Sequence, residues 1–211
     1  MSPSRPTTVL LVRHGATATT GTVLPGRAPG LHLSERGVTQ AQRVAERLSE
    51  LPRRPSALYA SPLERTRETA SPIARALKLR TTIDKGLLEC DFGQWTGRRL
   101  SALSRRSDWR QVQNSPSTFR FPDGESFVEM QLRMWSTIER LGARHRGRTI
   151  VVVSHADPIK AVVTYAQGVP LDLFQRTVIS PCSVSAIVLT GSSPVVLCVN
   201  STASLGELAP S

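Results

Sequence analysis

The chain has 211 residues, of which 39% are hydrophobic, enough for one globular domain with a sizeable core, and nothing in its composition indicates a second domain or a disordered protein. The formal net charge of +11 lies almost entirely in residues 1–110, which hold 19 Lys and Arg against 9 Asp and Glu and so favour an anionic ligand. Aromatic residues make up only 5% of the chain and do not alternate with the basic ones, so a nucleic-acid partner is not expected.

Three cysteines at irregular spacings, Cys90, Cys182 and Cys198, predict reduced thiols rather than a metal-binding pair. The first residues carry no apolar segment typical of a secretory signal, and no apolar stretch approaches the roughly 20 residues that span a bilayer. We therefore expect a cytoplasmic protein with no membrane partner. Residues 1–200 are expected to form one domain with a disordered tail at 201–211, and a homodimer stays open.

The first predicted strand and helix follow one another directly. The apolar run at residues 9–12 predicts a buried strand that ends at Arg13 and His14. A helix is then expected to begin after Ser34 as its N-cap and to end at Pro52. The apolar positions at helical spacing, which predict its buried face, are Val38, Ala41, Val44, Ala45, Leu48 and Leu51.

A second strand and helix are predicted next. Residues 57–60 form a short apolar run typical of a strand. After it, Ser61 and Glu64 match a capping box, and Pro62 occupies the position expected for the first helical residue. This interpretation places Arg65 in the first turn of the helix, beside the end of the strand.

The middle of the chain is less regular. A strand is expected around residues 82–83, followed by a loop that contains Pro and many arginines. A second capping box, Ser126 with Glu129, predicts the start of a long helix. One face of that helix is expected to carry Phe127, Met130, Met134, Ile138 and Leu141.

A further strand is predicted at residues 149–153, and it leads into His155. Asp157 and Pro158 are expected to act as the N-cap and first residue of a helix that stops at Gly168.

The last two apolar runs, at residues 184–189 and 195–199, predict a hairpin. Strands that alternate with helices are typical of an α/β fold. We expect a three-layer sandwich with a mostly parallel central sheet flanked by helices.

Chemically distinctive residues follow two of the predicted strands. Arg13 and His14 end the first strand, and His155 ends the strand at residues 149–153. In open α/β sheets, ligands bind beyond the carboxyl ends of the strands. A basic pocket with two histidines at this place suits a phosphate ester, so a small-molecule phosphate ester is the expected partner.

Several short motifs resemble, in order and spacing, those of the histidine phosphatase superfamily, which includes the cofactor-dependent phosphoglycerate mutases. The resemblance implies a phosphoglycerate mutase-like fold and runs from about residue 9 to residue 189. The motifs are RHGAT at 13–17, LSERG at 33–37, SPLERT at 61–66, LECDFG at 88–93, DGES at 123–126 and SH at 154–155.

The resemblance implies that His14 is a nucleophile that forms a phosphohistidine. A neutral imidazole is a good nucleophile near pH 7 when its second nitrogen donates to a fixed acceptor, and in the family that acceptor is a backbone carbonyl just after the histidine. The small Gly15 leaves room for this contact.

Four further roles follow from the same resemblance. Arg13 and Arg65 are expected to clamp the phosphoryl oxygens, because guanidinium groups match a phosphate bidentately. His155 is the expected second phosphate-binding histidine. Glu89 is the candidate general acid and base, which protonates the leaving alcohol and then deprotonates the attacking water.

The chain departs from the family pattern at three positions. Ala16 and Thr20 stand where many members have Gln or Glu and Asn, and Ala156 stands where a glycine is usual. Thr20 is still expected to donate a hydroxyl hydrogen bond to the phosphate. Arg27 is a candidate for binding the rest of the substrate, and a solvated loop arginine is the alternative interpretation.

A metal-independent phosphatase that hydrolyses a small anionic ester, with no cofactor, is the function these motifs predict. A phosphoglycerate-type mutase is the alternative, but the segment after Gly93 is short for an enzyme that must exclude water. A metal-dependent hydrolase is disfavoured, because two arginines beside a metal ion would repel it. Its ligands would be His14, Glu89, His155 and Asp157. The motifs leave the identity of the ester undetermined.

Overall fold

The computed structural model describes residues 5–203, which form one six-stranded sheet in the order β3-β2-β4-β1-β5-β6. The pairs β1–β4, β4–β2 and β2–β3 are parallel, and only β5 and β6 run antiparallel to their neighbours. The expected mostly parallel sheet is thus confirmed. The strands are β1 (Thr7–Arg13), β2 (Ala57–Ala60), β3 (Thr81–Ile83), β4 (Thr149–Ser154), β5 (Val184–Leu189) and β6 (Val195–Ser201).

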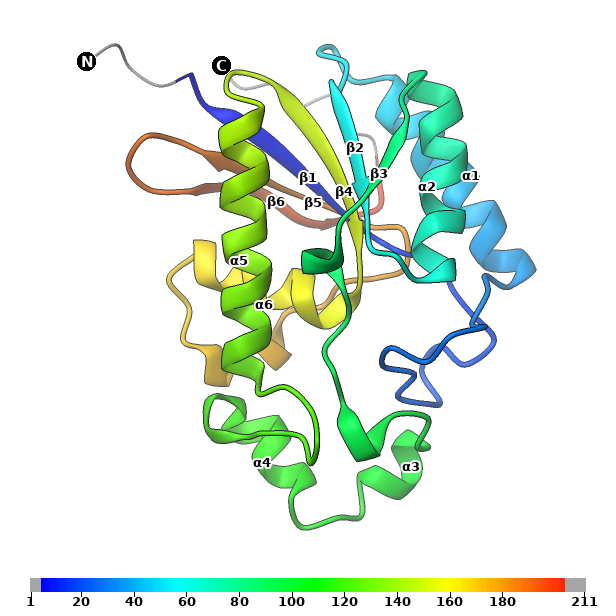
Figure 1. The fold of residues 1–211 in the computed structure, drawn as a ribbon, viewed down its shortest axis with the longest axis vertical. Coiled ribbons are helices and arrows are strands. Elements are labelled where there is room, and N and C mark those ends of the chain that lie inside the picture. The colour runs from blue at the N-terminus through cyan, green and yellow to red at the C-terminus, as the bar shows by residue number, and fades with distance from the viewer. Residues whose placement is uncertain (1–4, 204–211) are drawn as a thin grey trace.

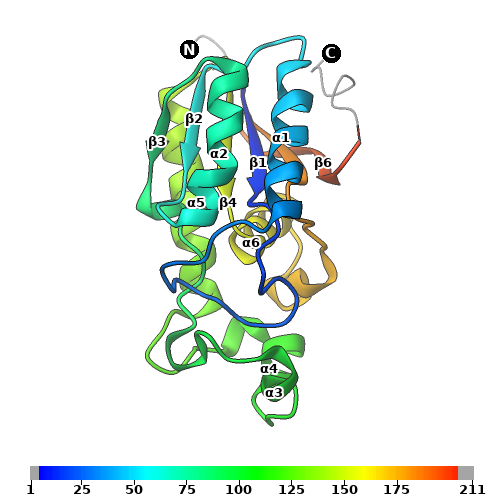
Figure 2. The ribbon, with the colours of Figure 1, turned by 90° about the vertical axis from the view of Figure 1, so that its right-hand side faces the viewer.

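Helices cover both faces of the sheet, as the three-layer prediction requires (Figures 1 and 2). The helices α1 (Glu35–Ser49) and α2 (Glu64–Leu77) pack on one face, and α5 (Phe127–Arg144) and α6 (Ala156–Ala166) pack on the other. Each face buries its own apolar cluster, since the central strands β1 and β4 are hydrophobic on both sides, as parallel strands usually are.

A third apolar cluster lies below the sheet, around two short helices in the irregular segment (Figure 1). These are α3 (Leu100–Leu103) and α4 (Trp109–Asn114), and single 3-10 turns precede and follow them. The cluster is rich in aromatic rings, among them Phe92, Trp95 and Phe121. It forms the outer wall of the region beyond the strand ends.

Two of the four predicted helix starts are confirmed and two are wrong. The Ser34 cap and the Ser126 capping box are present. At α2 the cap position is occupied by Leu63, and no side chain caps the helix, so the predicted Ser61 capping box does not form. The helix α6 begins at Ala156, one residue before Asp157, so Asp157 lies in the first turn instead of at the N-cap.

Smaller differences concern the edges of elements. Val38, an expected core residue, is 46% exposed, because the buried face of α1 is centred on Ala41, Val44 and Leu48. The last strand runs through Ser201, further than predicted, and the remainder of the expected disordered tail, 204–211, lies outside the described residues. Over residues 5–203 no helix has the length and hydrophobicity of a membrane span.

Candidate active site

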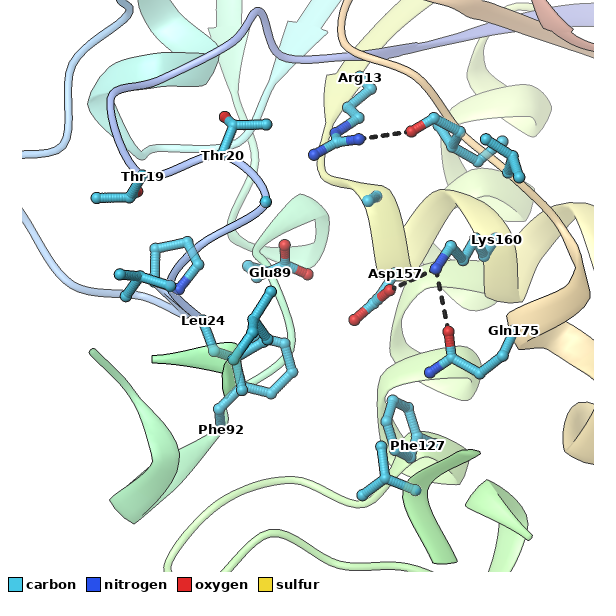
Figure 3. Close-up of a pocket in the computed structure, with 18 of the residues that line it drawn as sticks. Arg13, Thr19, Thr20, Leu24, Glu89, Phe92, Phe127, Asp157, Lys160 and Gln175 are labelled. Atoms are coloured by element: carbon cyan, nitrogen blue, oxygen red, sulfur yellow. Dashed lines mark hydrogen bonds and ion pairs between the residues drawn. The ribbon is translucent and has the colours of Figure 1, made fainter. Parts of the chain in front are cut away.

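The two predicted histidines meet because β1 and β4 are neighbours that end at the same register. Arg13 pairs with Ser154 at the last position of the two strands, so the next residues, His14 and His155, leave the sheet side by side. Their ring centroids are 5.2 Å apart. A cavity of about 430 Å³ opens above them, lined by the loop after β1, the start of α6 and the aromatic cluster (Figure 3).

The backbone around His14 sets which ring nitrogen is free. Nδ1 lies 2.7 Å from the carbonyl oxygen of Gly15, so Nδ1–H donates to that carbonyl and Nε2 keeps its lone pair. Burial, followed by the charges of Arg65 and Arg13, lowers the pKa of His14 to about 3. The imidazole is therefore neutral at physiological pH, the form that acts as a nucleophile.

Gly15 is required at its position by a close backbone contact. A Cβ atom there would lie 2.6 Å from the carbonyl oxygen of Gly37, at the start of α1. The amide of Gly15 also donates to Thr69 Oγ1 at 3.0 Å. These contacts hold the carbonyl that orients the His14 ring.

Two buried guanidinium groups lie beside His14. Arg65 is fully buried and donates one bond, from Nη2 to the carbonyl of Gly26 at 2.8 Å. Arg13 donates from Nη1 to the carbonyl of Ile179 at 2.6 Å. Arg13 Nε and Arg65 Nε and Nη1 are buried without any hydrogen-bond partner in residues 5–203. Since buried donors are normally paired, these three N–H groups are suited to an anion.

His155 also presents an unpaired nitrogen. Its Nε2 lies 2.9 Å from Ser61 Oγ, which explains why Ser61 does not cap α2. When the Ser61 hydroxyl donates to Nε2, the ring proton lies on Nδ1, which has no hydrogen-bond partner in the described chain and lies 4.0 Å from Oε2 of Glu89. Burial and the charge of Arg65 lower the pKa of His155 well below its usual value, so its ring is neutral too.

Glu89 faces the same space from the loop between β3 and α3. It is only 6% exposed, and its Oε1 accepts a hydrogen bond from the amide of Cys90. Burial, then the negative charge of Asp157, raises the pKa of Glu89 to about 7, although Arg65 and Arg13 act in the opposite direction. A carboxyl group with this pKa exchanges protons readily at neutral pH.

Thr20 and Arg27, the two remaining candidates, are placed differently. Thr20 lines the cavity (Figure 3). Its Oγ1 accepts from the amide of Thr17 at 2.8 Å, and phosphate binding by Thr20 stays a prediction. Arg27 does not line the cavity. It donates to the Glu89 carbonyl at 2.8 Å and forms an ion pair with Glu125 at 2.9 Å, so it supports the Glu89 loop from behind.

Arg133, which was not among the predicted site residues, holds the Glu89 loop in place from α5. Its guanidinium group forms two bonds of 2.8 and 2.9 Å with the carboxylate of Glu125, and Nη1 donates to the carbonyls of Gly86 and Leu88. Its spacing in α5 does not distinguish it from a surface arginine, so no local pattern indicates this role.

The second missed feature is a polar group on the opposite side of the cavity (Figure 3). Lys160 Nζ lies 3.3 Å from Asp157 Oδ1 and 3.1 Å from Gln175 Oε1, and all three side chains line the cavity. Asp157 appeared in the sequence only as an expected helix cap or a metal ligand. Within residues 5–203, no group of three or more His, Cys, Asp or Glu side chains is arranged to hold a metal ion.

Neutral histidines, buried guanidinium groups and a carboxyl group at the strand ends of an α/β sandwich define an enzyme that handles phosphate groups. The profile of the histidine phosphatase superfamily (branch 1) matches residues 9–202. This match covers nearly the whole chain. The chain therefore belongs to the histidine phosphatase superfamily, which confirms the predicted family and the enzyme class, a phosphoric monoester hydrolase.

Three relatives illustrate the similarity. Phosphoserine phosphatase 1 of Hydrogenobacter thermophilus is 33% identical over 204 residues, which cover 94% of each chain. A probable phosphoglycerate mutase of Erwinia tasmaniensis is 31% identical over 182 residues, 85% of this chain and 83% of that one. The solved structure of YhfR from Bacillus stearothermophilus, 25% identical, matches with a TM-score of 0.85 and covers 93% of this chain and 98% of its own.

Proposed function

We propose that the protein hydrolyses a small anionic phosphate ester through a phosphohistidine on His14, without a metal ion. The observation that carries this proposal is the set of buried nitrogens next to the neutral His14 ring that have no hydrogen-bond partner among residues 5–203. They comprise Arg13 Nε, Arg65 Nε, Arg65 Nη1 and His155 Nδ1. A dianionic phosphate ester has three non-bridging oxygens, and each can accept more than one hydrogen bond. Together they can accept from all four of these donors.

In the first step, Nε2 of His14 attacks phosphorus while the bond from phosphorus to the ester oxygen breaks. The protonated Glu89 gives its proton to the departing oxygen, so the leaving group departs as a neutral alcohol. Arg13, Arg65 and His155 donate to the equatorial oxygens and stabilise the charge that develops there. Thr20 contributes a hydroxyl donor when its own proton is turned toward the phosphate.

In the second step, water hydrolyses the phosphohistidine. The carboxylate of Glu89 takes a proton from the water, whose oxygen attacks phosphorus as the bond to Nε2 breaks. Inorganic phosphate leaves, and both His14 and Glu89 return to their starting forms. One carboxyl group serves both steps, because its pKa of about 7 lets both protonation states be populated at neutral pH.

Relatives with different names support this interpretation to different extents. The phosphoserine phosphatase relative matches more of the chain than the probable mutase does, which favours hydrolysis over phosphoryl transfer to a second substrate. Phosphoserine is accordingly the first natural ester to test.

The three free thiols, Cys90, Cys182 and Cys198, support a cytoplasmic location.

The test is hydrolysis of phenyl phosphate by the wild type and by His14→Ala, each with and without EDTA and vanadate. In parallel, the reaction is quenched rapidly, and the acid-stable and acid-labile phosphate bound to the protein are measured. His32→Ala is the matched control, since His32 is exposed and bonded to Glu68 outside the cavity. We expect the wild type and His32→Ala to be active in EDTA, to be inhibited by vanadate and to carry acid-labile phosphate. We expect His14→Ala to lose both the activity and the acid-labile phosphate. Activity lost with EDTA contradicts the metal-free proposal. Phosphoryl transfer between phosphoglycerates at the expense of hydrolysis identifies a mutase.

A further inference from the structure

The cavity has an apolar wall that phosphate binding does not use. Leu24 and Trp109 are its partly exposed members, and they pack against the cluster that contains Phe92 and Phe127, two cavity-lining rings that are almost fully buried. Leu24, Phe92 and Phe127 lie on the same side of the cavity (Figure 3). The wall is rigid, because the Phe92 and Phe127 rings each pack edge to face against Phe121, at centroid distances of 4.9 and 5.2 Å. Such a wall is complementary to an apolar, flat group.

The size of the cavity also suits a ligand with an apolar, flat group. At about 430 Å³ it falls within the range of pockets that bury ligands larger than a three-carbon acid. Phosphoserine and phosphoglycerate have no apolar part that would cover the partly exposed side chains of Leu24 and Trp109.

Opposite the apolar wall lies the polar edge, which we define as Asp157, Lys160 and Gln175. Lys160 occupies one oxygen of Asp157 and the amide oxygen of Gln175. The second oxygen of Asp157 and the Nε2 group of Gln175 have no hydrogen-bond partner among the described residues. The edge thus offers one acceptor and one donor to a ligand, held in place by the ammonium group of Lys160, which also lies 5.7 Å from the Phe174 ring.

Building on the proposed phosphatase function, we propose that the leaving group of the substrate is a ring-bearing alcohol with a hydrogen-bond donor and an acceptor on one side. Its ring lies against Leu24 and Trp109, the partly exposed side chains of the wall that Phe92 and Phe127 support. Its donor binds Asp157 and its acceptor binds Gln175. Asp157 and Glu89 line the same cavity and face the same space (Figure 3), so the ligand edge lies close to the ester oxygen.

Three synthetic esters separate these contributions. Phosphoserine has neither a ring nor a carboxamide, benzyl phosphate has the ring alone, and 3-carbamoylbenzyl phosphate adds one amide donor and one carbonyl acceptor. We expect kcat/KM to rise by about tenfold from phosphoserine to benzyl phosphate, because the ring buries apolar surface. We expect a further rise of about tenfold with the carbamoyl group, the fold-change of one to two net hydrogen bonds. Gln175→Leu and Lys160→Met should reduce the ratio of the two benzyl esters toward one, and the exposed Lys85→Met is the matched control.

Each outcome has one meaning. Phosphoserine hydrolysed as efficiently as benzyl phosphate overturns the ring assignment. A carbamoyl preference that survives in both Gln175→Leu and Lys160→Met overturns the assignment of the polar edge. Failure of the proposed function is distinguishable from both, because no ester would then phosphorylate His14, whereas a failed specificity proposal leaves the acid-labile phosphoprotein in place.

Discussion

Replacing Glu89 with glutamine tests whether its raised pKa is used in catalysis. The side chain is 6% exposed, and burial together with Asp157 raises its pKa from 4.5 to about 7. At pH 7 about half of the Glu89 side chains are then protonated, against about 0.3% for a carboxyl group of pKa 4.5. The glutamine amide in the Glu89→Gln variant would occupy the same volume, but it would supply no proton to the leaving group and accept none from water.

The expected loss depends on the leaving group. For benzyl phosphate, whose alkoxide needs a proton, Glu89→Gln should lower kcat/KM by about 10²–10⁴. For 4-nitrophenyl phosphate, the leaving group departs as an anion, so the variant should still phosphorylate His14. Because dephosphorylation needs Glu89 as a base, 4-nitrophenolate should appear as a stoichiometric burst followed by slow turnover.

The pH profile of the wild type shows in which direction kcat/KM changes as Glu89 loses its proton. Glu89 is protonated below its pKa, so kcat/KM for benzyl phosphate should fall as pH rises through about 7, and this alkaline limb should be absent in Glu89→Gln. Stopped-flow absorbance measures the burst, and steady-state assays measure the limb. Equal losses for both esters with no burst, or a limb that persists in the variant, would refute the role of Glu89 as the proton donor.

Three further predictions follow from single contacts. Asp157→Asn removes the negative charge that raises the pKa of Glu89, so the alkaline limb for benzyl phosphate should move to lower pH, and an unmoved limb contradicts the coupling. Arg65→Lys replaces a buried fork by a point charge, so kcat/KM should fall by about 10²–10³ and vanadate should inhibit less, whereas unchanged vanadate inhibition would exclude contact with the phosphate. Arg133→Met removes the two bonds from Arg133 to Glu125, which keeps its ion pair with Arg27, and the donor to the Gly86 and Leu88 carbonyls, so the free energy of unfolding should fall by about 2–3 kcal/mol in urea titrations, and an unchanged midpoint would show that the network is not stabilising.

Local sequence patterns predicted two of the four helix starts correctly and the other two wrongly. The Ser126 capping box is present because all of its bonds join residues within one helical turn. The same pattern at Ser61 was wrong, because His155, 94 residues away, takes the Ser61 hydroxyl at 2.9 Å. A local motif predicts a cap only when no distant group competes for it.

The residues that we propose for the chemistry were indicated by motifs that place particular residue types at strand ends. His14, Arg65, Glu89 and His155 all lie at one place, as the order and spacing of the motifs indicated. Arg27 shows the limit of such reasoning, since its place in a loop says nothing about which carboxylates surround it. Its partners are Asp91 and Glu125, and they direct it away from the cavity.

By itself, the sequence indicated most of the elements, the enzyme family and the candidate reactive side chains, because these depend on spacing along the chain. Only the tertiary structure decided which nitrogen of His14 is free, how acidic Glu89 is, and which side chains face the leaving group. Those properties arise from burial and from charges on segments that are distant in the chain, such as Arg65 on α2 and Asp157 on α6. Their effect depends on distance in space, which the order of residues does not specify.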